Sequence, residues 1–213
     1  MNNKTIVSFT MVMLLLLGMK HAEAGVIDIC CGNLSASTWG PGVASYGQTF
    51  TVPLGNSVLV DYSFSVLTMN AQFLYVSQVY AWDGSGVTGA ALFTSTALLS
   101  PLPLDIFTTV VFAPSIAVTA GHQYIALVTN QPFGAPFGGP PDSGGGMFLN
   151  QDNPYSGGEF VFKDGNPEIG PWFLTLSNAD AVFHADFVPE PATLVLFGLG
   201  LALLTVIGKA SAR

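Results

Sequence analysis

The stretch SVLVDYSFSVL, from Ser57 to Leu67, decides the fold class of this chain. Hydrophobic or aromatic side chains stand at every second position of it, and mostly polar ones lie between: Val58, Val60, Tyr62, Phe64 and Val66 alternate with Leu59, Asp61, Ser63 and Ser65. A period of two is typical of a β-strand that buries one face and leaves the other in water. We therefore expect the side chains on the Tyr62 face to enter a hydrophobic core.

Similar short segments, separated by Gly, Pro, Asp and Ser turn signals, fill the centre of the chain. Further strands are predicted at residues 48–52, 72–82, 90–99, 107–112, 116–130 (folded about Ala120-Gly121), 146–150, 158–163, 171–176 and 180–187. In the last segment Ala181, Phe183, Ala185 and Phe187 share one face. No segment shows convincing helical periodicity with caps. The pattern predicts an all-β domain over residues 25–187, a β-sandwich or jelly roll.

The central domain is strongly acidic. Only Lys163, of the five basic residues, lies between Gly25 and Val188, while all but two of the 13 acidic residues do. Such a domain repels phosphates and anionic lipid headgroups, so we expect no nucleic-acid partner. Cations and neutral polymers fit it better, although solubility alone also explains the charge.

The first 24 residues have the features of a secretory signal peptide. Lys4 precedes an apolar run from Ile6 to Gly18, and Ala22-Glu23-Ala24 is a small-x-small cleavage sequence. We expect signal peptidase to cut between Ala24 and Gly25, which makes Gly25 the mature N-terminus. An uncleaved anchor is the alternative.

The only two cysteines, Cys30 and Cys31, are neighbours. A bridge between them is possible in an exported protein, but it is strained because disulfides prefer more widely spaced Cα atoms. The pattern favours one buried and one exposed thiol. An intermolecular bridge or a metal contact is the alternative.

A second apolar run, from Ala192 to Gly208, carries no charge and spans about 25 Å as a helix. That length is just enough for a transmembrane helix. Pro189 and Pro191 separate it from the domain, because proline interrupts helices. The basic tail 209–213 holds Lys209 and Arg213, which places the C-terminus in the cytoplasm.

The end of the chain, Val188-Pro189-Glu190-Pro191 followed by this run and tail, resembles the PEP-CTERM sorting signal of exported bacterial proteins. Its tail is less densely basic than is usual in that family. The resemblance implies that exosortase, a membrane-embedded transpeptidase, recognises and processes the motif at residues 188–191. It also implies transient anchoring in the inner membrane, then a place at the cell surface or outside, among extracellular polysaccharide. An ordinary C-terminal anchor is the alternative.

The central segments also resemble a jelly-roll domain that recurs in PEP-CTERM proteins. The cues are YAWDGSGVTGAALFTS from Tyr80, VTAGHQYIALVT from Val118 and DAVFHADF from Asp180. This resemblance implies a fold and no reaction.

No arrangement of residues typical of catalysis is present. The chain lacks a G-x-S-x-G nucleophile motif and shows no spaced pair of carboxylates of the kind that a glycosidase needs. His122, in a predicted turn, and His184, on the outer face of the last strand, are expected to be solvated or singly hydrogen-bonded. We therefore predict no catalytic residue and no enzymatic activity.

Two kinds of binding site remain. In a sugar site, Trp39, Trp82 and Trp172 could stack on the sugar rings. Tyr80 and Tyr155 would supply hydrogen bonds, although core packing is the favoured interpretation of each tryptophan. Oxygen ligands for calcium, a less favoured hypothesis, are Asp83, Asp164 and Asn166.

The sequence thus predicts an exported surface or matrix protein, structural or glycan-interacting and without catalysis. An unusual polysaccharide hydrolase and a calcium-dependent adhesion module are the alternatives.

Overall fold

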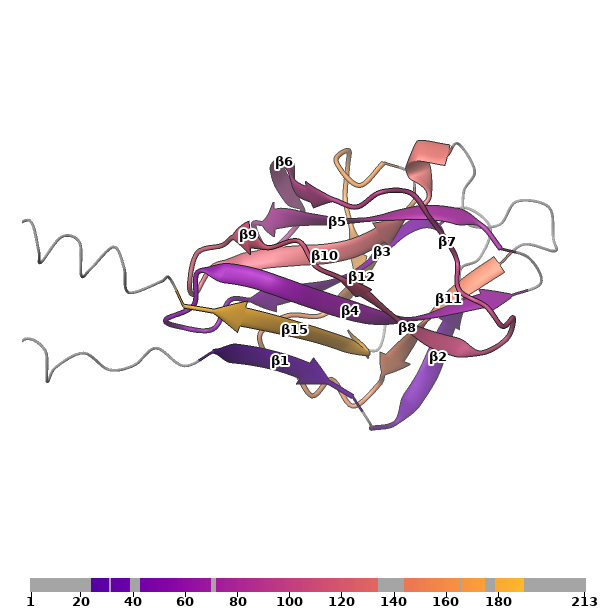
Figure 1. Cartoon of the computed structure of the whole chain (residues 1–213), viewed down its shortest axis with the longest axis horizontal. Coiled ribbons are helices and arrows are strands. Elements are labelled where there is room, and N and C mark those ends of the chain that lie inside the picture. The colour runs from indigo at the N-terminus through magenta and orange to yellow at the C-terminus, as the bar shows by residue number, and fades with distance from the viewer. Residues whose placement is uncertain are drawn as a thin grey trace, which may run out of the picture.

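The computed structural model describes residues 24–30, 32–38, 43–69, 72–133, 144–164, 166–174 and 179–189 (Figure 1). These residues form two antiparallel β-sheets, which confirms the all-β prediction. The helical structure among them is limited to a single 3₁₀ turn, η1, at Gln131–Phe133. The finer prediction of a jelly roll stays a prediction.

The first sheet has eight strands in the order β1-β15-β4-β11-β14, with β2 beside β11 and with β8 and β9 beside β4. Its strands are β1 Gly25–Ile29, β2 Leu34–Thr38, β4 Val58–Met69, β8 Phe107–Phe112, β9 Ile116–Ala117, β11 Gly144–Asn150, β14 Asp180–Ala181 and β15 Phe183–Val188. The N-terminal strands β1 and β2 were not predicted, whereas the other members overlap predicted segments.

The second sheet has seven strands in the order β13-β12-β3-β10-β5-β6, with β7 beside β5. Its strands are β3 Val43–Thr51, β5 Leu74–Trp82, β6 Val87–Thr94, β7 Leu98–Leu99, β10 Gln123–Thr129, β12 Phe160–Asp164 and β13 Phe173–Leu174. The predicted strand at residues 90–99 is therefore two strands, β6 and β7.

The main core lies between the sheets and is rich in aromatic rings. Phe183 of β15 approaches Phe64 of β4, with ring centroids 5.2 Å apart, and Phe50 of β3, at 5.7 Å. The predicted inward face of β15 is confirmed, because Ala181, Phe183, Ala185 and Phe187 are all buried. Such rings bury large apolar areas and hold the two sheets together.

A β-bulge changes the predicted alternation in β4. Asp186 pairs with Asp61 but the next residue, Phe187, pairs with Leu59, so Val60 is the extra residue. Leu59 therefore enters the core with Tyr62, while Val60 is only half-buried. The predicted inward face is correct from Tyr62 onward and wrong before it, because a bulge shifts the period-two pattern by one residue.

The second sheet buries residues on both faces. Tyr124 and Ala126 of β10 face the main core, whereas Ile125 and Leu127 join a second cluster with Val161. Tyr80, Trp82 and Trp172 complete that second cluster. A segment that follows β12 and carries Trp172 thus covers the outer face of this sheet, which explains why β10 reads as a continuous apolar run.

The structure tests the predictions about the cysteines and the chain ends only in part. Cys30 is exposed and disulfide-bonded, which differs from the prediction of free thiols, and Cys31 lies outside the described residues. Within the described residues, no helix has the length and hydropathy needed to cross a membrane. The predicted signal peptide up to Glu23 and the predicted span 192–208 lie outside them.

Candidate functional site

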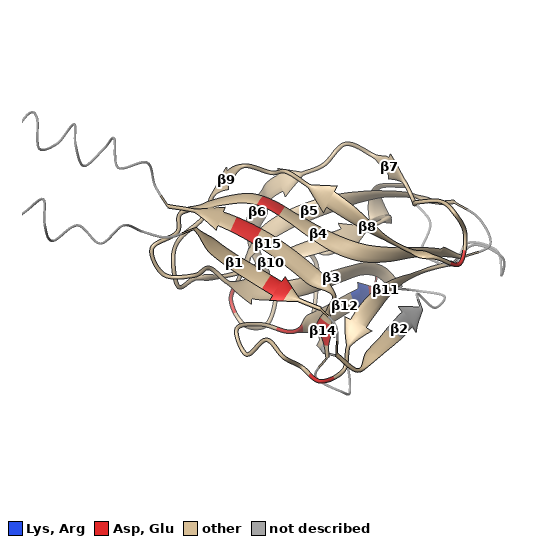
Figure 2. Cartoon of the chain, turned by 60° about the horizontal axis from the view of Figure 1, so that its bottom comes forward, with Lys and Arg blue, Asp and Glu red and all other residues tan. Residues whose placement is uncertain are grey.

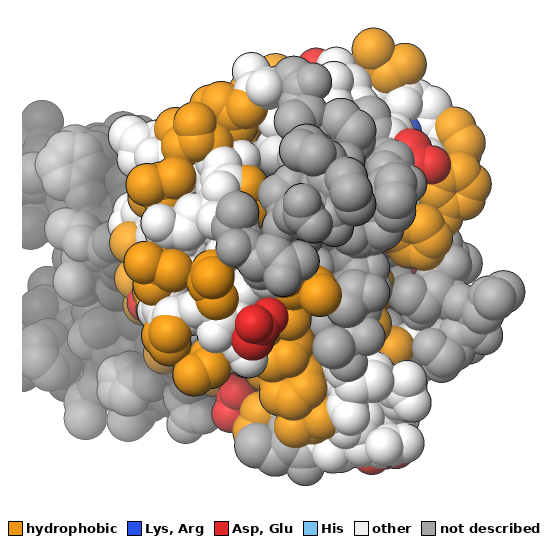
Figure 3. Space-filling view, turned by 90° about the vertical axis from the view of Figure 1, so that its right-hand side faces the viewer, with side chains coloured by type: hydrophobic (Ala, Val, Ile, Leu, Met, Phe, Trp, Pro, Cys, Tyr) orange, Lys and Arg blue, Asp and Glu red, His pale blue; other side chains and the backbone are white. Residues whose placement is uncertain are grey.

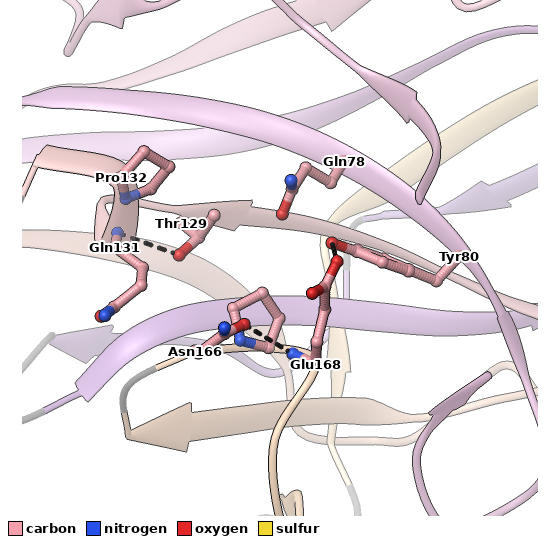
Figure 4. A pocket seen from close by; sticks show the side chains of 8 residues that line it. Gln78, Tyr80, Thr129, Gln131, Pro132, Asn166 and Glu168 are labelled. Carbon is pink, nitrogen blue, oxygen red and sulfur yellow. Dashed lines mark hydrogen bonds between the residues drawn. The ribbon is translucent and has the colours of Figure 1, made fainter. Parts of the chain in front are cut away.

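A pocket opens on the outer side of the second sheet and has a volume of about 250 Å³. Strands β5 and β10, the η1 turn and the segment after β12 supply its walls (Figure 4). The lining residues are Gln78, Tyr80, Thr129, Gln131, Pro132, Asn166, Pro167 and Glu168. We call it the Tyr80–Glu168 pocket.

The pocket takes its name from a hydrogen bond between its two walls. The Tyr80 hydroxyl donates to Oε1 of Glu168 at 3.1 Å. Burial and the Glu168 carboxylate raise the pKa of Tyr80, so the phenol keeps its proton at physiological pH. Glu168 itself is exposed, and its backbone N–H donates to Oδ1 of Asn166 at 2.8 Å.

Lys163 fixes the segment that carries Glu168. This side chain is only 1% exposed, and its ammonium donates to the carbonyl oxygens of Gly170 and Pro171. Its Nζ also lies 5.8 Å from the centre of the Trp172 ring. Burial lowers the pKa of Lys163. The buried lysine therefore ties residues 166–172 to β12 and shapes the pocket.

One acceptor that lines the pocket has no partner in the described structure. Oε1 of Gln78 is buried and accepts no hydrogen bond, while Nε2 of the same amide donates to Thr94 at 3.3 Å. Figure 4 shows the amide oxygen directed toward the interior of the pocket. A buried acceptor without a donor costs free energy, and a small rotation of the Gln78 side chain would let a ligand hydroxyl pair with this oxygen.

The exposed aromatic residue nearest in sequence to the pocket is Phe133. It follows the lining residue Pro132 in η1 and is 38% exposed. Sequence reasoning missed both Phe133 and Gln78. The signal for Phe133 was its place at the start of a long Pro/Gly-rich stretch, from Gln131 to Gly146, whereas nothing in the local sequence marked Gln78.

Three of the five predicted aromatic residues do come together, but as packing. Trp82 and Trp172 meet edge to face at 5.9 Å, each is only 8% exposed, and Tyr80 lies in the same cluster. The Trp172 indole N–H donates to the Pro167 carbonyl. Trp82 and Trp172 therefore pack in a buried cluster and present no flat face to a sugar, which agrees with the favoured interpretation, and of the three rings only Tyr80 lines the pocket.

The remaining two aromatic candidates lie elsewhere. Tyr155 is half-buried, and its hydroxyl donates to the Thr51 carbonyl at 3.1 Å. Its backbone N–H donates to the fully buried carboxylate of Asp180, which also accepts from Gln48. Burial raises the pKa of Asp180. Tyr155 thus belongs to a structural network, and Trp39 lies outside the described residues.

The predicted calcium ligands are used by turns. Oδ1 of Asp83 accepts from both groups of Ser85, N–H and O–H, and from the Gly86 N–H. These hydrogen bonds lower the pKa of Asp83. Oδ1 of Asn166 accepts from Glu168, and Asp164 ends β12. Among the described His, Cys, Asp and Glu residues, neither Asp83 nor Asp164 belongs to a group of three that could hold a metal ion.

The predicted processing positions at the two ends of the domain lie side by side. Gly25 begins β1 and pairs with Phe187 of β15, whose last residue is Val188 (Figure 1). The Gly25 N–H donates to the buried amide of Asn56 at 3.0 Å, and a Cβ at Gly25 would come within 2.9 Å of Pro53. Ala24 is exposed and Pro189 half-exposed, while Ala22, Glu190 and Pro191 lie outside the described residues.

Exposed hydrophobic side chains gather at the end of the domain opposite the termini (Figure 3), and the connection from β7 to β8 supplies aliphatic ones. The connecting loop exposes Leu102 at 58% and Ile106 at 53%. Aliphatic side chains lack the flat π-face that stacks on a sugar ring. This end therefore gives no reason to move the candidate site away from the Tyr80–Glu168 pocket.

A family model described as the PEP-CTERM protein-sorting motif matches residues 187–209. The match confirms the resemblance seen at the end of the chain. The motif indicates an exported protein that exosortase-type machinery sorts toward the cell surface. No curated protein matches the chain.

Solved structures are similar to this chain at low identity. Two are of Cwp84, a cysteine protease associated with the surface layer of Clostridium difficile. One, with its cysteine protease and lectin-like domains, is 12% identical with a TM-score of 0.45 and covers 73% of this chain and 36% of its own. The other, after propeptide cleavage, is 12% identical with a TM-score of 0.49 and covers 80% and 41%.

A third similar structure is that of infectious bursal disease virus. It is 14% identical with a TM-score of 0.34 and covers 79% of this chain and 41% of the viral chain. The chain thus spans less than half the length of the solved chains it matches. With TM-scores below 0.5, these likenesses carry no argument about function.

Proposed function

We propose that this chain is an exported, non-catalytic module that binds a neutral glycan in the Tyr80–Glu168 pocket at or near the cell surface. The unpaired Gln78 oxygen among amide, carboxylate and hydroxyl groups is the observation that carries the proposal. Amide and carboxylate groups pair well with the hydroxyls of a sugar, because a hydroxyl can both donate to their oxygens and accept from an amide N–H. The exported address supplies a setting in which polysaccharide is available.

The charge of the pocket supports a neutral ligand. Glu168 is its single ionisable acid among the described lining residues, and none of those residues is basic. An acidic sugar would meet uncompensated repulsion in a domain with a single central base, Lys163. A neutral hexose-type ring instead offers hydroxyl donors to Gln78 and Glu168.

The number of carboxyl groups in the pocket favours binding over hydrolysis. Retaining and inverting glycosidases both use two carboxyl groups on either side of the scissile bond. The described lining of the pocket offers one, and the buried Asp180 is occupied by Gln48 and Tyr155. We therefore place this chain among binding modules, with the hydrolase as the outcome that would replace this proposal.

Binding should depend on Gln78 and Glu168. We expect Gln78→Leu and Glu168→Gln each to weaken binding of a neutral oligosaccharide, selected on a glycan array, by about tenfold, which is the effect of losing one hydrogen bond in the pocket. Isothermal titration calorimetry on the full-length protein in detergent measures this. Gln151→Leu, at an exposed turn, is the matched control and should bind normally. Equal affinity in all three variants, or turnover of the sugar, would contradict the proposal.

The finer steps of export belong to the same proposal: cleavage after Ala24, anchoring through residues 192–208, and processing at residues 188–191. Because Gly25 and Phe187 pair, both termini of the folded domain leave from the same end of the first sheet (Figure 1). The domain can then stand on the membrane by that end while it is anchored. The Tyr80–Glu168 pocket belongs to the second sheet, whereas β1 and β15 belong to the first.

Processing should depend on the carboxylate of Glu190. We expect Glu190→Gln to slow release of the protein at least about tenfold, since an enzyme that reads this carboxylate loses a charge-assisted hydrogen bond. Immunoblots of membrane and released fractions, in a host that has exosortase, measure the rate. Glu23→Gln, in the predicted leader, serves as the control for loss of an acid elsewhere. Release of the Glu190→Gln variant at the original rate would mean that exosortase does not recognise the carboxylate of Glu190.

A further inference from the structure

We infer that Asp61, His184 and Asp186 bind a divalent transition-metal ion on the outer face of the first sheet. One ligand atom from each of these side chains lies within 4.8 Å of the others. Ligands in one zinc shell are about 3–4 Å apart, since each metal–ligand bond measures about 2 Å. Small rotations of these half-exposed side chains would close the shell.

The fold itself places the three groups together. His184 and Asp186 are two residues apart in β15, so both point away from the core, on the face opposite Phe183 and Phe187. Asp61 of β4 stands directly opposite Asp186. The bulge at Val60 follows that pair at once, and bulges commonly re-aim side chains beside functional sites.

Nδ1 of His184 lies beside a carboxylate, which is the partner that a metal-binding imidazole needs on its non-ligating nitrogen. Nε2 lies 3.3 Å from Asp186, whereas Nδ1 lies 3.6 Å from Oδ1 of Asp28 on β1. Metal-ligating histidines usually direct their other ring N–H to a carboxylate, which fixes the tautomer and the ring orientation. Asp28 is thus a positioning residue, and Nε2 is left to the metal.

In the part of the chain that the structure describes, no Lys or Arg side chain lies beside Asp28, Asp61 and Asp186 to offset their negative charge. Asp28 is paired with His184 across β1 and β15, and Asp61 is paired with Asp186 across β4 and β15. Figure 2 shows acidic residues on these adjacent strands, and like charges directly opposite one another repel. Lys163 is the one Lys or Arg among the described residues, and it is buried in the other sheet. A bound cation would remove this repulsion.

The ligand set selects the class of ion. One imidazole with two carboxylates suits a first-row transition ion, whereas Ca²⁺ prefers six to eight oxygen ligands. Three protein ligands on an open sheet face leave at least one coordination position for water. Zn²⁺ is the probe that fits this set and is spectroscopically silent, so binding is followed by competition with a chromophoric chelator.

The test uses the full-length protein, purified in detergent, stripped with EDTA and kept oxidised so that Cys30 stays in its disulfide. We expect one equivalent of Zn²⁺ to bind and Ca²⁺ in excess not to displace it. His184→Asn and Asp61→Asn should each weaken binding by at least about tenfold, and Asp28→Asn should weaken it less, through the ring orientation. A thermal melt of each variant without metal separates loss of binding from loss of fold.

Matched controls decide between this site and adventitious binding. His122→Asn removes the other histidine of the central domain, which lies in a turn before β10, and Asp105→Asn removes an exposed acid. Both should bind zinc like the unchanged protein. Zinc uptake that survives in His184→Asn, or that is lost in His122→Asn, would overturn the inference. So would the absence of any uptake at micromolar zinc.

Discussion

Replacing Phe183 with alanine is expected to lower the free energy of unfolding by about 4 kcal/mol, because large-to-small changes of buried phenylalanine cost about 3–5 kcal/mol. Phe183 is 1% exposed and pairs in register with Phe64 within the first sheet. Its ring also lies 5.7 Å from that of Phe50 in the second sheet. The cavity left by alanine would therefore open where both sheets meet and where neither can collapse easily.

Urea unfolding of the full-length protein, followed by the fluorescence of the buried Trp82 and Trp172, measures this loss. Val111→Ala is the matched control, because Val111 is 63% exposed on β8 of the same sheet. That change should alter stability by no more than about 0.5 kcal/mol. A loss below about 1.5 kcal/mol for Phe183→Ala would show that the two sheets do not share one rigid core.

Strand positions could be predicted wherever one face of a strand is buried and the other is wet. The segment from Ala181 to Phe187 shows this best, since its alternation predicted the residues that are buried there. The same rule failed at Val58 and Val60, because a bulge is set by pairing with β15 and leaves no mark in the local pattern. It also missed β1, a five-residue strand whose partner lies at the far end of the chain.

The candidate site was harder to predict, because it depends on contacts between distant segments. The sequence indicated the aromatic residues Tyr80, Trp82 and Trp172 but not which of their atoms would face solvent. Lys163 had no predicted role, since its partners are backbone carbonyls after β12. His184 was expected on an outer face, which is correct, and Asp186 lies two residues further along the same strand. Asp28 and Asp61 could not be predicted, because they come from strands that are brought beside β15 only by the sheet order.

Replacing Lys163 with methionine is expected to lower the free energy of unfolding by about 3 kcal/mol, since hydrogen bonds from charged groups contribute about 1.5–3 kcal/mol each. Methionine keeps most of the volume of the buried stem but donates nothing to the carbonyl oxygens of Gly170 and Pro171. Part of the loss is offset, because methionine carries no charge that must be desolvated; burial lowers the pKa of Lys163 for the same reason.

The more informative consequence concerns the pocket. Without the ammonium, residues 166–172 lose the two hydrogen bonds that tie them to Lys163 and are held to β12 only through the adjoining β13. We therefore expect Asn166 and Glu168 to face Tyr80 in a less fixed position. Glycan binding by Lys163→Met should fall further than by Glu168→Gln, because a whole wall is released rather than one hydrogen bond. Asp164→Asn, at the exposed neighbouring position, is the control for both measurements and should leave stability and binding unchanged. If Lys163→Met unfolds like the unchanged protein and still binds, the buried lysine does not hold the wall, and the pocket must owe its shape to the Trp82–Trp172 contact instead.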